Sequence, residues 1–339
     1  MIIKDGWWVG TYTSSGSKGI YYAAWPDSAP PRDVAEIPNP SWLVRTPDNF
    51  LLVCSELGME DGMPESRLHV MRAGASGSLM EVSSIGTGGT LACHAGYAPK
   101  KRLVAAAHYG SGDITLFRLG LDGKPSLLQY ARPDVQAMPR ISRMHCCIFT
   151  RMENLLLVCD LGSDCIHRFD VTGKAEPLAY SGSIPLPVSS GPRHMVLSKD
   201  EKLAYISCEL SNELMVVDLG QEKVVARRSL VDTDFEGFAA AAAIKWHPDE
   251  GMLAVSCRGN DQIKLFLIDG VGIPVPHGAI STAAWPHDIA FSADGRYLLA
   301  ACEKAGALQV FDGQDGWKCL ERSQVNIPIP VCLLPVYHP

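Results

Sequence analysis

The chain has 339 residues, a formal net charge of −7 and 47% hydrophobic residues. The acidic balance argues against a nucleic-acid surface, which would carry a basic stripe. The absence of a run of about 18 apolar residues argues against a membrane helix. Residues 1–10 lack the apolar segment of a secretory signal, so we expect a cytoplasmic protein that forms a single domain over residues 1–339.

The first two predicted strands have no partner at the start of the chain. Residues 7–13 (WWVGTYT) and 19–25 (GIYYAAW) are rich in aromatic and β-branched side chains, which indicates strands. They resemble the second and third strands of a repeated unit that lacks its first strand.

Six complete copies of this unit follow. Each begins with a strand, a polar turn and a second strand, at residues 40–56, 92–108, 144–160, 191–210, 242–258 and 286–303. A third strand preceded by Gly, Asn or Asp comes next, at residues 66–73, 112–119, 164–171, 212–219, 261–268 and 306–313. The copies are about 44–52 residues apart, a period typical of four-stranded propeller blades.

The last predicted strand, residues 328–336 (PIPVCLLPV), resembles a first strand without a second. Pairing it with the N-terminal strands would complete a seventh unit and remove the open sheet edges. The sequence therefore predicts an all-β, seven-bladed β-propeller with four-stranded blades, its ring closed by pairing of the N- and C-terminal strands.

One of the longer connections, residues 124–141, contains three prolines and two arginines. It is expected either to overhang one face and help enclose a ligand or to be an ordinary outer strand with a long turn.

Cysteines recur at one position of the repeat. Cys159, Cys208, Cys257 and Cys302 stand next to the last polar residue of the second strand in four successive units. The total of 11 cysteines is odd, so we expect small buried side chains rather than disulfides.

Ionisable residues recur at corresponding strand ends. The second strands end in Glu56, His108, Asp160, Glu209, Arg258 and Glu303. The first strands open with Trp42, His94, His145, Arg193, His194 and His287. A single charged strand end is usually solvated or in a structural ion pair. Because first strands line the channel of a propeller, six such ends predict a ring of ionisable groups and a ligand pocket at one mouth.

Several motifs carry a family resemblance. DLGSD at 160–164, GPRH at 191–194 and CRGND at 257–261 occur in this order, with GTYT at 10–13, NPSWL at 39–43, HYGSGDI at 108–114 and PVCLLPV at 330–336. Over essentially its whole length the chain resembles the seven-bladed lactonase family, which includes propeller-type 6-phosphogluconolactonase and fungal carboxy-cis,cis-muconate cyclase.

The resemblance implies catalytic roles for His145, Arg193, Glu209 and Arg258. The other polar strand ends are candidate substrate-binding residues: His94, His108, Asp160, His194, His287, Glu303 and Glu56. Three positions depart from the family pattern, with Cys257 in place of Asn, His108 followed by Tyr109 in place of an Asn-Tyr pair, and His287 in place of Arg. Loss of a permanent cation at 287 would weaken binding of a phosphate.

Opening of a sugar lactone by water requires a base for the water proton and cationic donors for the oxyanion. Glu209 between Arg193 and Arg258 is the preferred base, and the arginines would hold the oxyanion or an anionic substrate group. If the arginines weaken Glu209 as a base, His145 takes that role and Glu209 orients them. The predicted reaction is hydrolysis of a small anionic sugar lactone, first of all 6-phosphogluconolactone to 6-phosphogluconate.

Two alternatives stay open at this point. One is a lactonising cycloisomerase of the muconate type, and the other is a non-catalytic propeller that binds a metabolite or protein partner, because fold alone does not fix activity. We expect no metal and no cofactor, since neighbouring residues such as Cys93 and His94, or His145 and Cys146, point to opposite faces of a strand. The oligomeric state is not predicted.

Overall fold

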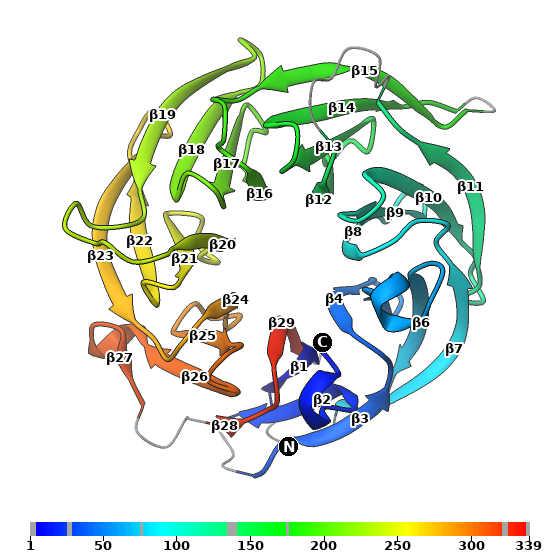
Figure 1. Cartoon of the computed structure of the whole chain (residues 1–339), viewed down its shortest axis with the longest axis horizontal. Coiled ribbons are helices and arrows are strands. Elements are labelled where there is room, and N and C mark those ends of the chain that lie inside the picture. Colours follow the sequence, from blue (N-terminus) through cyan, green and yellow to red (C-terminus); the bar gives the residue numbers. More distant parts are fainter. Residues whose placement is uncertain are drawn as a thin grey trace. The chain divides into compact units, whose positions relative to one another are not determined.

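The computed structural model describes residues 5–25, 29–74, 77–133, 141–173, 176–320 and 325–336. The chain divides into two compact units. The middle unit comprises Pro38–Gly74 and Leu79–Met195, and the terminal unit comprises Met1–Ile37, Ala75–Ser78 and Val196–Pro339. Each unit is built from antiparallel sheets whose strands are labelled in Figure 1.

The middle unit contains three four-stranded sheets. The first consists of β4 (Pro40–Arg45), β5 (Phe50–Ser55), β6 (Arg67–Ala73) and β7 (Leu79–Gly86). The second consists of β8 (Ala92–Ala98), β9 (Leu103–His108), β10 (Asp113–Leu119) and β11 (Pro125–Ala131). The third consists of β12 (Met144–Phe149), β13 (Leu155–Asp160), β14 (Cys165–Val171) and β15 (Leu178–Pro185). Strand β8 contacts both β4 and β12, so neighbouring sheets meet through their first strands.

Three further sheets lie wholly or mainly in the terminal unit. The first consists of β16 (Pro192–Leu197), β17 (Leu203–Cys208), β18 (Glu213–Asp218) and β19 (Lys223–Ser229). The second consists of β20 (Ala240–Trp246), β21 (Met252–Arg258), β22 (Gln262–Ile268) and β23 (Pro274–Ser281). The third consists of β24 (Pro286–Phe291), β25 (Tyr297–Cys302), β26 (Ala307–Asp312) and two short strands that both pair with β26, β27 (Lys318–Cys319) and β28 (Val325–Asn326).

The seventh sheet joins the two ends of the chain. Its order is β29 (Pro330–Val336), β1 (Asp5–Thr11), β2 (Gly19–Trp25) and β3 (Arg32–Glu36). Val9 of β1 is opposite Leu333 of β29, and Figure 1 shows the red C-terminal strand beside the blue N-terminal ones. The predicted seven-bladed propeller with four-stranded blades, closed by pairing of the terminal strands, is confirmed.

The sequence pattern of each strand matches its place in the sheet. The second strands are largely apolar before their final residue, and every residue of β5 and β9 is buried. The outer strand β19 instead alternates between exposed and half-buried residues along its length. A strand covered on both faces needs apolar residues at every position, whereas an outer strand needs them only at alternate positions. The cores therefore lie between adjacent sheets, as where Leu116, Val158 and Phe169 pack together.

The residue before the third strand adopts a left-handed backbone in most units. Its φ is positive at Gly112, Asp164, Asn212, Asp261 and Gly306. Only Gly, and less often Asn or Asp, enters this region at low cost. The turn geometry thus explains the Gly, Asn and Asp residues that recur at this position of the sequence.

The cysteines behave as the repeat predicted. None of the 11, all of which lie in the described part of the chain, is in a disulfide, and Cys159, Cys208, Cys257 and Cys302 have no exposed surface. These four side chains fill buried positions in the strands and form no disulfide, which confirms their predicted structural role.

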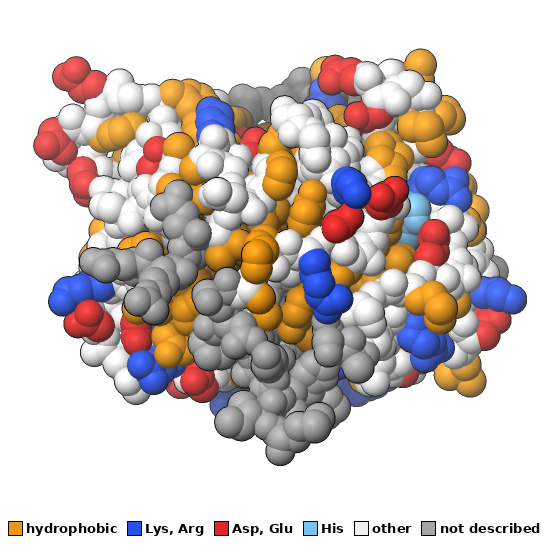
Figure 2. Space-filling view, turned by 90° about the horizontal axis from the view of Figure 1, so that it is seen from below, with side chains coloured by type: hydrophobic (Ala, Val, Ile, Leu, Met, Phe, Trp, Pro, Cys, Tyr) orange, Lys and Arg blue, Asp and Glu red, His pale blue; other side chains and the backbone are white. Residues whose placement is uncertain are grey.

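The connection at residues 124–141 begins as an outer strand, since β11 covers Pro125–Ala131. This part matches the expectation of an ordinary outer strand. Residues 134–140, where the loop was expected to overhang one face, lie outside the described residues. On the face shown in Figure 2, acidic and basic side chains are interspersed with apolar ones. The described residues contain no helix with the length and apolar character needed to span a bilayer.

Candidate functional site

The first strand β12 contains a β-bulge near its start. Met144 is opposite Asp160 and Cys146 is opposite Cys159, so His145 is an extra residue between the two pairs. A bulge turns the extra side chain out of the regular alternation and is frequent next to functional sites. The strand therefore sets His145 apart from its neighbours.

The same irregularity recurs in other first strands. In β24 the register shifts between Pro286 and Asp288, which makes His287 the extra residue. In β4 and β8 the corresponding residues are Ser41 and Cys93. His145 and His287 thus occupy equivalent positions in two different blades.

The middle unit gathers rings and a cation into what we call the histidine cluster: Trp42, His94, His145, Arg193 and His194. The Trp42 and His94 rings are stacked with centroids 4.1 Å apart. The His194 ring meets Trp42, His94 and His145 edge-on at 5.1, 5.6 and 5.2 Å. The structure therefore brings together four of the predicted ionisable residues and one aromatic residue within this unit.

Contacts within the histidine cluster define the tautomer of His94 and the position of the Arg193 guanidinium. The Cys147 N–H donates to His94 Nδ1 at 3.3 Å, which places the ring proton of neutral His94 on Nε2, 3.5 Å from Cys146 Sγ. Arg193 Nη1 lies 3.2 and 3.3 Å from the two ring nitrogens of His194. Arg193 is 3% exposed, and its planar fork suits carboxylate or phosphate oxygens.

Tyr109 borders the histidine cluster. Its ring meets the His145 ring edge-on at 5.9 Å, and the Arg143 guanidinium lies 5.2 Å from the Tyr109 ring centroid. Arg143 also donates to the carbonyls of Tyr109 and Gly110 at 3.1 and 2.8 Å. These contacts hold Tyr109 against the imidazole of His145.

The terminal unit contains a second group, which we call the arginine–glutamate cluster: Glu209, Arg258, Trp285, His287, Glu303 and Lys304. Arg258 Nη2 lies 2.6 Å from Glu209 Oε2. Arg258 also donates to the backbone carbonyls of Ala240 and Ala241 at 3.3 and 3.4 Å. The guanidinium is thereby fixed at the end of β21.

Trp285 has an unusual backbone conformation beside Arg258. Its φ is +69°, and its N–H donates to Asp261 Oδ1 at 2.8 Å while its carbonyl accepts from the Glu303 N–H at 2.9 Å. A bulky residue at positive φ is strained, and such strain is concentrated at functional sites. The Lys304 Nζ lies 3.1 Å and the Arg258 guanidinium carbon 5.7 Å from the Trp285 ring centroid.

His287 and Glu303 form a close pair, with Nδ1 2.8 Å from Oε2. Burial opposes ionisation of Glu303, but the hydrogen bond and charge of His287 together with the charges of Arg258 and Lys304 lower the pKa of this carboxyl. The ionised carboxylate can only accept a hydrogen bond, so His287 Nδ1 must carry a proton.

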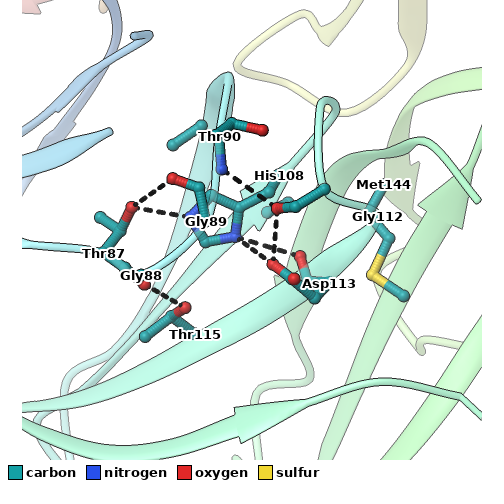
Figure 3. A network of polar contacts seen from close by, with 12 residues as sticks. Thr87, Gly88, Gly89, Thr90, His108, Gly112, Asp113, Thr115 and Met144 are labelled. Atoms are coloured by element: carbon teal, nitrogen blue, oxygen red, sulfur yellow. Dashed lines mark hydrogen bonds and ion pairs between the residues drawn. The ribbon is translucent and has the colours of Figure 1, made fainter. Parts of the chain in front are cut away.

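Two predicted ligand-binding residues, His108 and Asp160, have hydrogen-bond partners within the protein. His108 is fully buried, with Nε2 2.8 Å from Thr87 Oγ1 and Nδ1 2.9 Å from Asp113 Oδ1. Figure 3 shows the His108 ring between Thr87 and Asp113. Burial opposes ionisation of Asp113, but His108 and Arg132 lower its pKa. Both ring nitrogens of His108 therefore serve the packing of this sheet, and its predicted contact with substrate stays a prediction.

Asp160 is likewise fully buried. Its Oδ1 accepts from the backbone N–H groups of Arg143, Gly162 and Ser163 at 2.7, 3.0 and 3.1 Å, and its Oδ2 lies 3.0 Å from His167 Nε2. These bonds fix the turn after β13, which accounts for an aspartate at this strand end without a ligand.

The ligand atoms of Asp160, Cys165 and His167 lie within 4.8 Å of one another. Cys165 Sγ is 3.6 Å from Nε2 and 3.8 Å from Nδ1 of His167. Because Cys165 Sγ is almost equally far from the two ring nitrogens, it lies beside the ring and not in front of Nε2, where an ion bound to Nε2 would be. Burial also raises the pKa of the Cys165 thiol. The arrangement fits an Asp–His hydrogen bond beside a thiol better than a metal site, and the expectation of no metal stays a prediction.

Glu56, the remaining predicted residue, follows β5. Its backbone N–H donates to the Asn39 carbonyl at 2.8 Å, and its carbonyl accepts from Asn39 Nδ2 at 3.2 Å. The backbone of Glu56 is therefore held by the segment that precedes β4.

Sequence comparison of strand ends missed several aromatic and basic neighbours. Trp285 and Lys304 flank the predicted residues His287 and Glu303 in sequence, and Phe238 stacks on Trp285 with ring centroids 6.0 Å apart. The sequence signal that could have identified Trp285 as a site residue is its position immediately before a first strand. Its contact with the two cations could not be predicted, because that contact depends on the left-handed backbone of Trp285.

With the propeller fold and the two clusters established, the class of protein is defined. The chain belongs to the family described as lactonase, 7-bladed beta-propeller, whose model matches residues 6–335. This confirms the resemblance found in the sequence motifs.

Individual relatives give the following likenesses. A 6-phosphogluconolactonase of Bacillus subtilis is 27% identical over 342 residues, which cover 96% of this chain and 97% of that protein. The periplasmic gluconolactonase PpgL of Pseudomonas aeruginosa superposes with a TM-score of 0.89 at 27% identity, over 99% of this chain and 100% of that one. A protein from Lactobacillus plantarum superposes with a TM-score of 0.88 at 22% identity, over 98% and 100% of the two chains, and supports the fold alone.

Proposed function

We propose that the protein hydrolyses a sugar lactone, with 6-phosphogluconolactone as the first candidate substrate. Membership of the lactonase family supports this proposal, as does the name of the Bacillus subtilis relative. The observation that carries it is the Glu209–Arg258 pair, which sets a guanidinium beside a carboxylate within the terminal unit.

Arg258 and Arg193 are proposed to bind the oxyanion or an anionic group of the substrate. A guanidinium offers two parallel donors to such oxygens, and a fixed donor stabilises the charge that develops in the transition state. Because Glu209 Oε2 already accepts from Arg258 at 2.6 Å, the contact favours an orienting role for Glu209 over the role of base.

Lys304 supports a phosphorylated substrate. It and Arg258 are permanent cations on the same Trp285 ring, and together they would compensate for the histidine at position 287. We expect Lys304→Gln to lower kcat/KM for 6-phosphogluconolactone about tenfold, which corresponds to ~1.4 kcal/mol, and to lower hydrolysis of unphosphorylated gluconolactone much less. Lys318→Gln is the matched control, since Lys318 is exposed and pairs with Asp315.

Acid release from freshly prepared 6-phosphogluconolactone, measured against spontaneous hydrolysis, tests the reaction itself. Hydrolysis by the wild-type protein that is lost in Arg193→Ala and Glu209→Ala supports the proposal. Turnover of a muconate without lactone hydrolysis would assign the cycloisomerase reaction instead. Inactivity on both classes of substrate would contradict an enzymatic role.

We also propose a cytoplasmic location. The relative PpgL is a periplasmic protein, so the location needs its own test. Fractionation of cells that carry the native gene should recover the protein with cytoplasmic markers, and recovery with periplasmic markers would reject the proposal.

A further inference from the structure

We propose that His287, held by Glu303, is the residue that transfers protons in the lactone hydrolysis. This inference rests on the proposed function and adds a catalytic residue to it. Four observations support it: the position of His287 in the fold, its tautomer, the charges around Glu303 and the engagement of Glu209.

The position of His287 repeats that of His145. Each is the extra residue of a β-bulge in a first strand, in β24 and β12 respectively. His145 is the histidine that the family resemblance marks for the site. A second histidine therefore occupies the equivalent bulge position in another blade, where the family pattern has an arginine.

The tautomer of His287 suits a base. Since Nδ1 donates to Glu303 Oε2 at 2.8 Å, the neutral ring has its lone pair on Nε2. A carboxylate that fixes the tautomer also stabilises the imidazolium formed when Nε2 accepts a proton. The His287 side chain is 11% exposed, so the ring is largely shielded from bulk water.

Charged neighbours keep the Glu303 carboxylate ionised. Against the effect of burial, the hydrogen bond from His287 and the charges of Arg258 and Lys304 lower the pKa of Glu303. The Tyr12 ring, from the segment after β1, lies 6.2 Å from the His287 ring. Arg258 lies at the end of β21, Lys304 follows β25 and Tyr12 follows β1, so three segments surround the His287–Glu303 pair.

Asp288, the next residue of β24, is engaged elsewhere. Its Oδ1 is ion-paired with Lys245 at 3.3 Å, and its Oδ2 accepts from the Leu333 N–H at 2.8 Å. Glu303 is thus the carboxylate that the structure pairs with the His287 ring.

The competing carboxylate has a different role. Glu209 Oε2 lies 2.6 Å from Arg258 Nη2, and a carboxylate oxygen that holds a guanidinium is poorly placed to take a proton from water. Arg258 in turn acts on Glu303 through its charge. Arg258 can therefore stabilise an oxyanion while His287, the partner of Glu303, accepts the proton.

In the proposed reaction His287 moves one proton from water to the leaving oxygen. His287 Nε2 takes a proton from water as the water oxygen bonds to the lactone carbonyl carbon, and the carbonyl electron pair moves onto oxygen beside Arg258. The oxyanion then reforms the carbonyl, the ring C–O bond breaks, and the leaving oxygen takes the proton back from His287 Nε2. The products are a free hydroxyl and a carboxylic acid that ionises in solution.

The test compares kcat and its pH profile in wild type, His287→Asn and Glu303→Gln on the best lactone substrate. An asparagine amide can still donate to Glu303 but has no basic nitrogen. We expect His287→Asn to lower kcat about 10²-fold or more with little change in KM, and to abolish the acid limb of the pH profile. Glu303→Gln should lower kcat by a smaller factor and displace the acid limb.

His247→Asn is the matched control, because His247 also pairs with a carboxylate, Asp249, at 2.7 Å but lies in a turn between β20 and β21. It should keep wild-type activity. Thermal unfolding checks that each variant is folded, and if His287→Asn does not fold, the displaced acid limb of Glu303→Gln decides.

Wild-type hydrolysis with an unchanged kcat and acid limb in a folded His287→Asn would overturn this inference and leave the proposed function intact. Loss of the limb in His145→Asn but not in His287→Asn would also overturn it and assign the base to the other bulge. A wild-type protein inactive on every lactone would instead remove the proposed function, and with it the reaction that His287 is proposed to serve.

Discussion

Arg258 reaches Glu209 from the end of β21 with its Nη2 2.6 Å from Oε2, while its Nε and Nη2 donate to two backbone carbonyls. The Arg258 side chain is 10% exposed and that of Glu209 is 24% exposed. A cation fixed in this way need not reorganise when a substrate develops negative charge, which is the property that electrostatic catalysis requires.

Replacement of this cation should therefore impair catalysis more than stability. We expect Arg258→Met, which preserves part of the packing, to lower kcat/KM about 10²-fold. Because the two groups act as a unit, Glu209→Gln combined with Arg258→Met should cost less than the sum of the single effects. Steady-state kinetics on the lactone checks this result.

The matched control is Arg227→Met, since Arg227 pairs with Glu213 at 2.7 Å but is 51% exposed. Equal losses of activity in Arg227→Met and Arg258→Met would show that the Glu209–Arg258 pair has no special role.

The His108 network predicts a steric effect at Gly89. A Cβ there would lie 2.6 Å from the His108 ring and 2.7 Å from Ser111 Oγ, in a network that cannot move without loss of buried hydrogen bonds. We expect Gly89→Ala to lower the free energy of unfolding by about 1–3 kcal/mol. Gly278→Ala, where nothing lies within 4 Å of the added Cβ, should change it little. Urea denaturation measures both, and equal stabilities would contradict the packing described.

The free energy of unfolding should decrease at acidic pH because Asp113 becomes protonated. His108 and Arg132 lower its pKa in the folded state despite burial. A depressed pKa adds stability above the unfolded-state value of about 4, and this contribution disappears as pH falls through the folded value. We expect Asp113→Asn to cost about 1–3 kcal/mol at pH 7 and the gap from wild type to narrow below about pH 4.

Chemical unfolding at a series of pH values checks the Asp113 prediction. Asp122→Asn serves as a comparison, since Asp122 is exposed and lies in a surface turn. A gap between wild type and Asp113→Asn that is constant from pH 7 to pH 3 would count against an ionised Asp113 in the folded protein.

Thiol reactivity should distinguish one cysteine from the rest. Of the 11 free cysteines only Cys319 is exposed, and burial raises the pKa of Cys54 to about 12. A thiol-specific chromogenic reagent should therefore label one thiol rapidly in the native protein and none in Cys319→Ser. Denaturation should release all of them. Rapid labelling of several thiols in the folded protein would contradict the buried positions.

Much of the fold could be predicted because the repeat leaves a strong trace in the sequence. The segment 164–171 was expected as a third strand and forms β14, Cys165–Val171. Apart from the outer strand considered for residues 124–141, the outer strands were not located, because an exposed, irregular pattern such as that of β27 and β28 gives little periodic signal.

The site was predictable only at the level of strand ends. The sequence pattern of a polar strand end is the same in both cases: when the residue binds an internal partner, as Asp160 does, and when it lies beside a guanidinium, as Glu209 does. The bulges at His145 and His287 add one residue without disturbing the apolar pattern. The contact of Lys304 with Trp285 depends on a backbone angle that side-chain type does not report.

The pairing of β1 with β29 has a consequence for biosynthesis. During translation the earliest strand emerges long before its partner, and until then it presents an unpaired edge that invites aggregation. A truncation that removes β29 should therefore harm yield far more than its seven residues suggest. In a circular permutant opened between two blades, the strands of every blade would be contiguous in sequence, so each blade could form as soon as it has been translated.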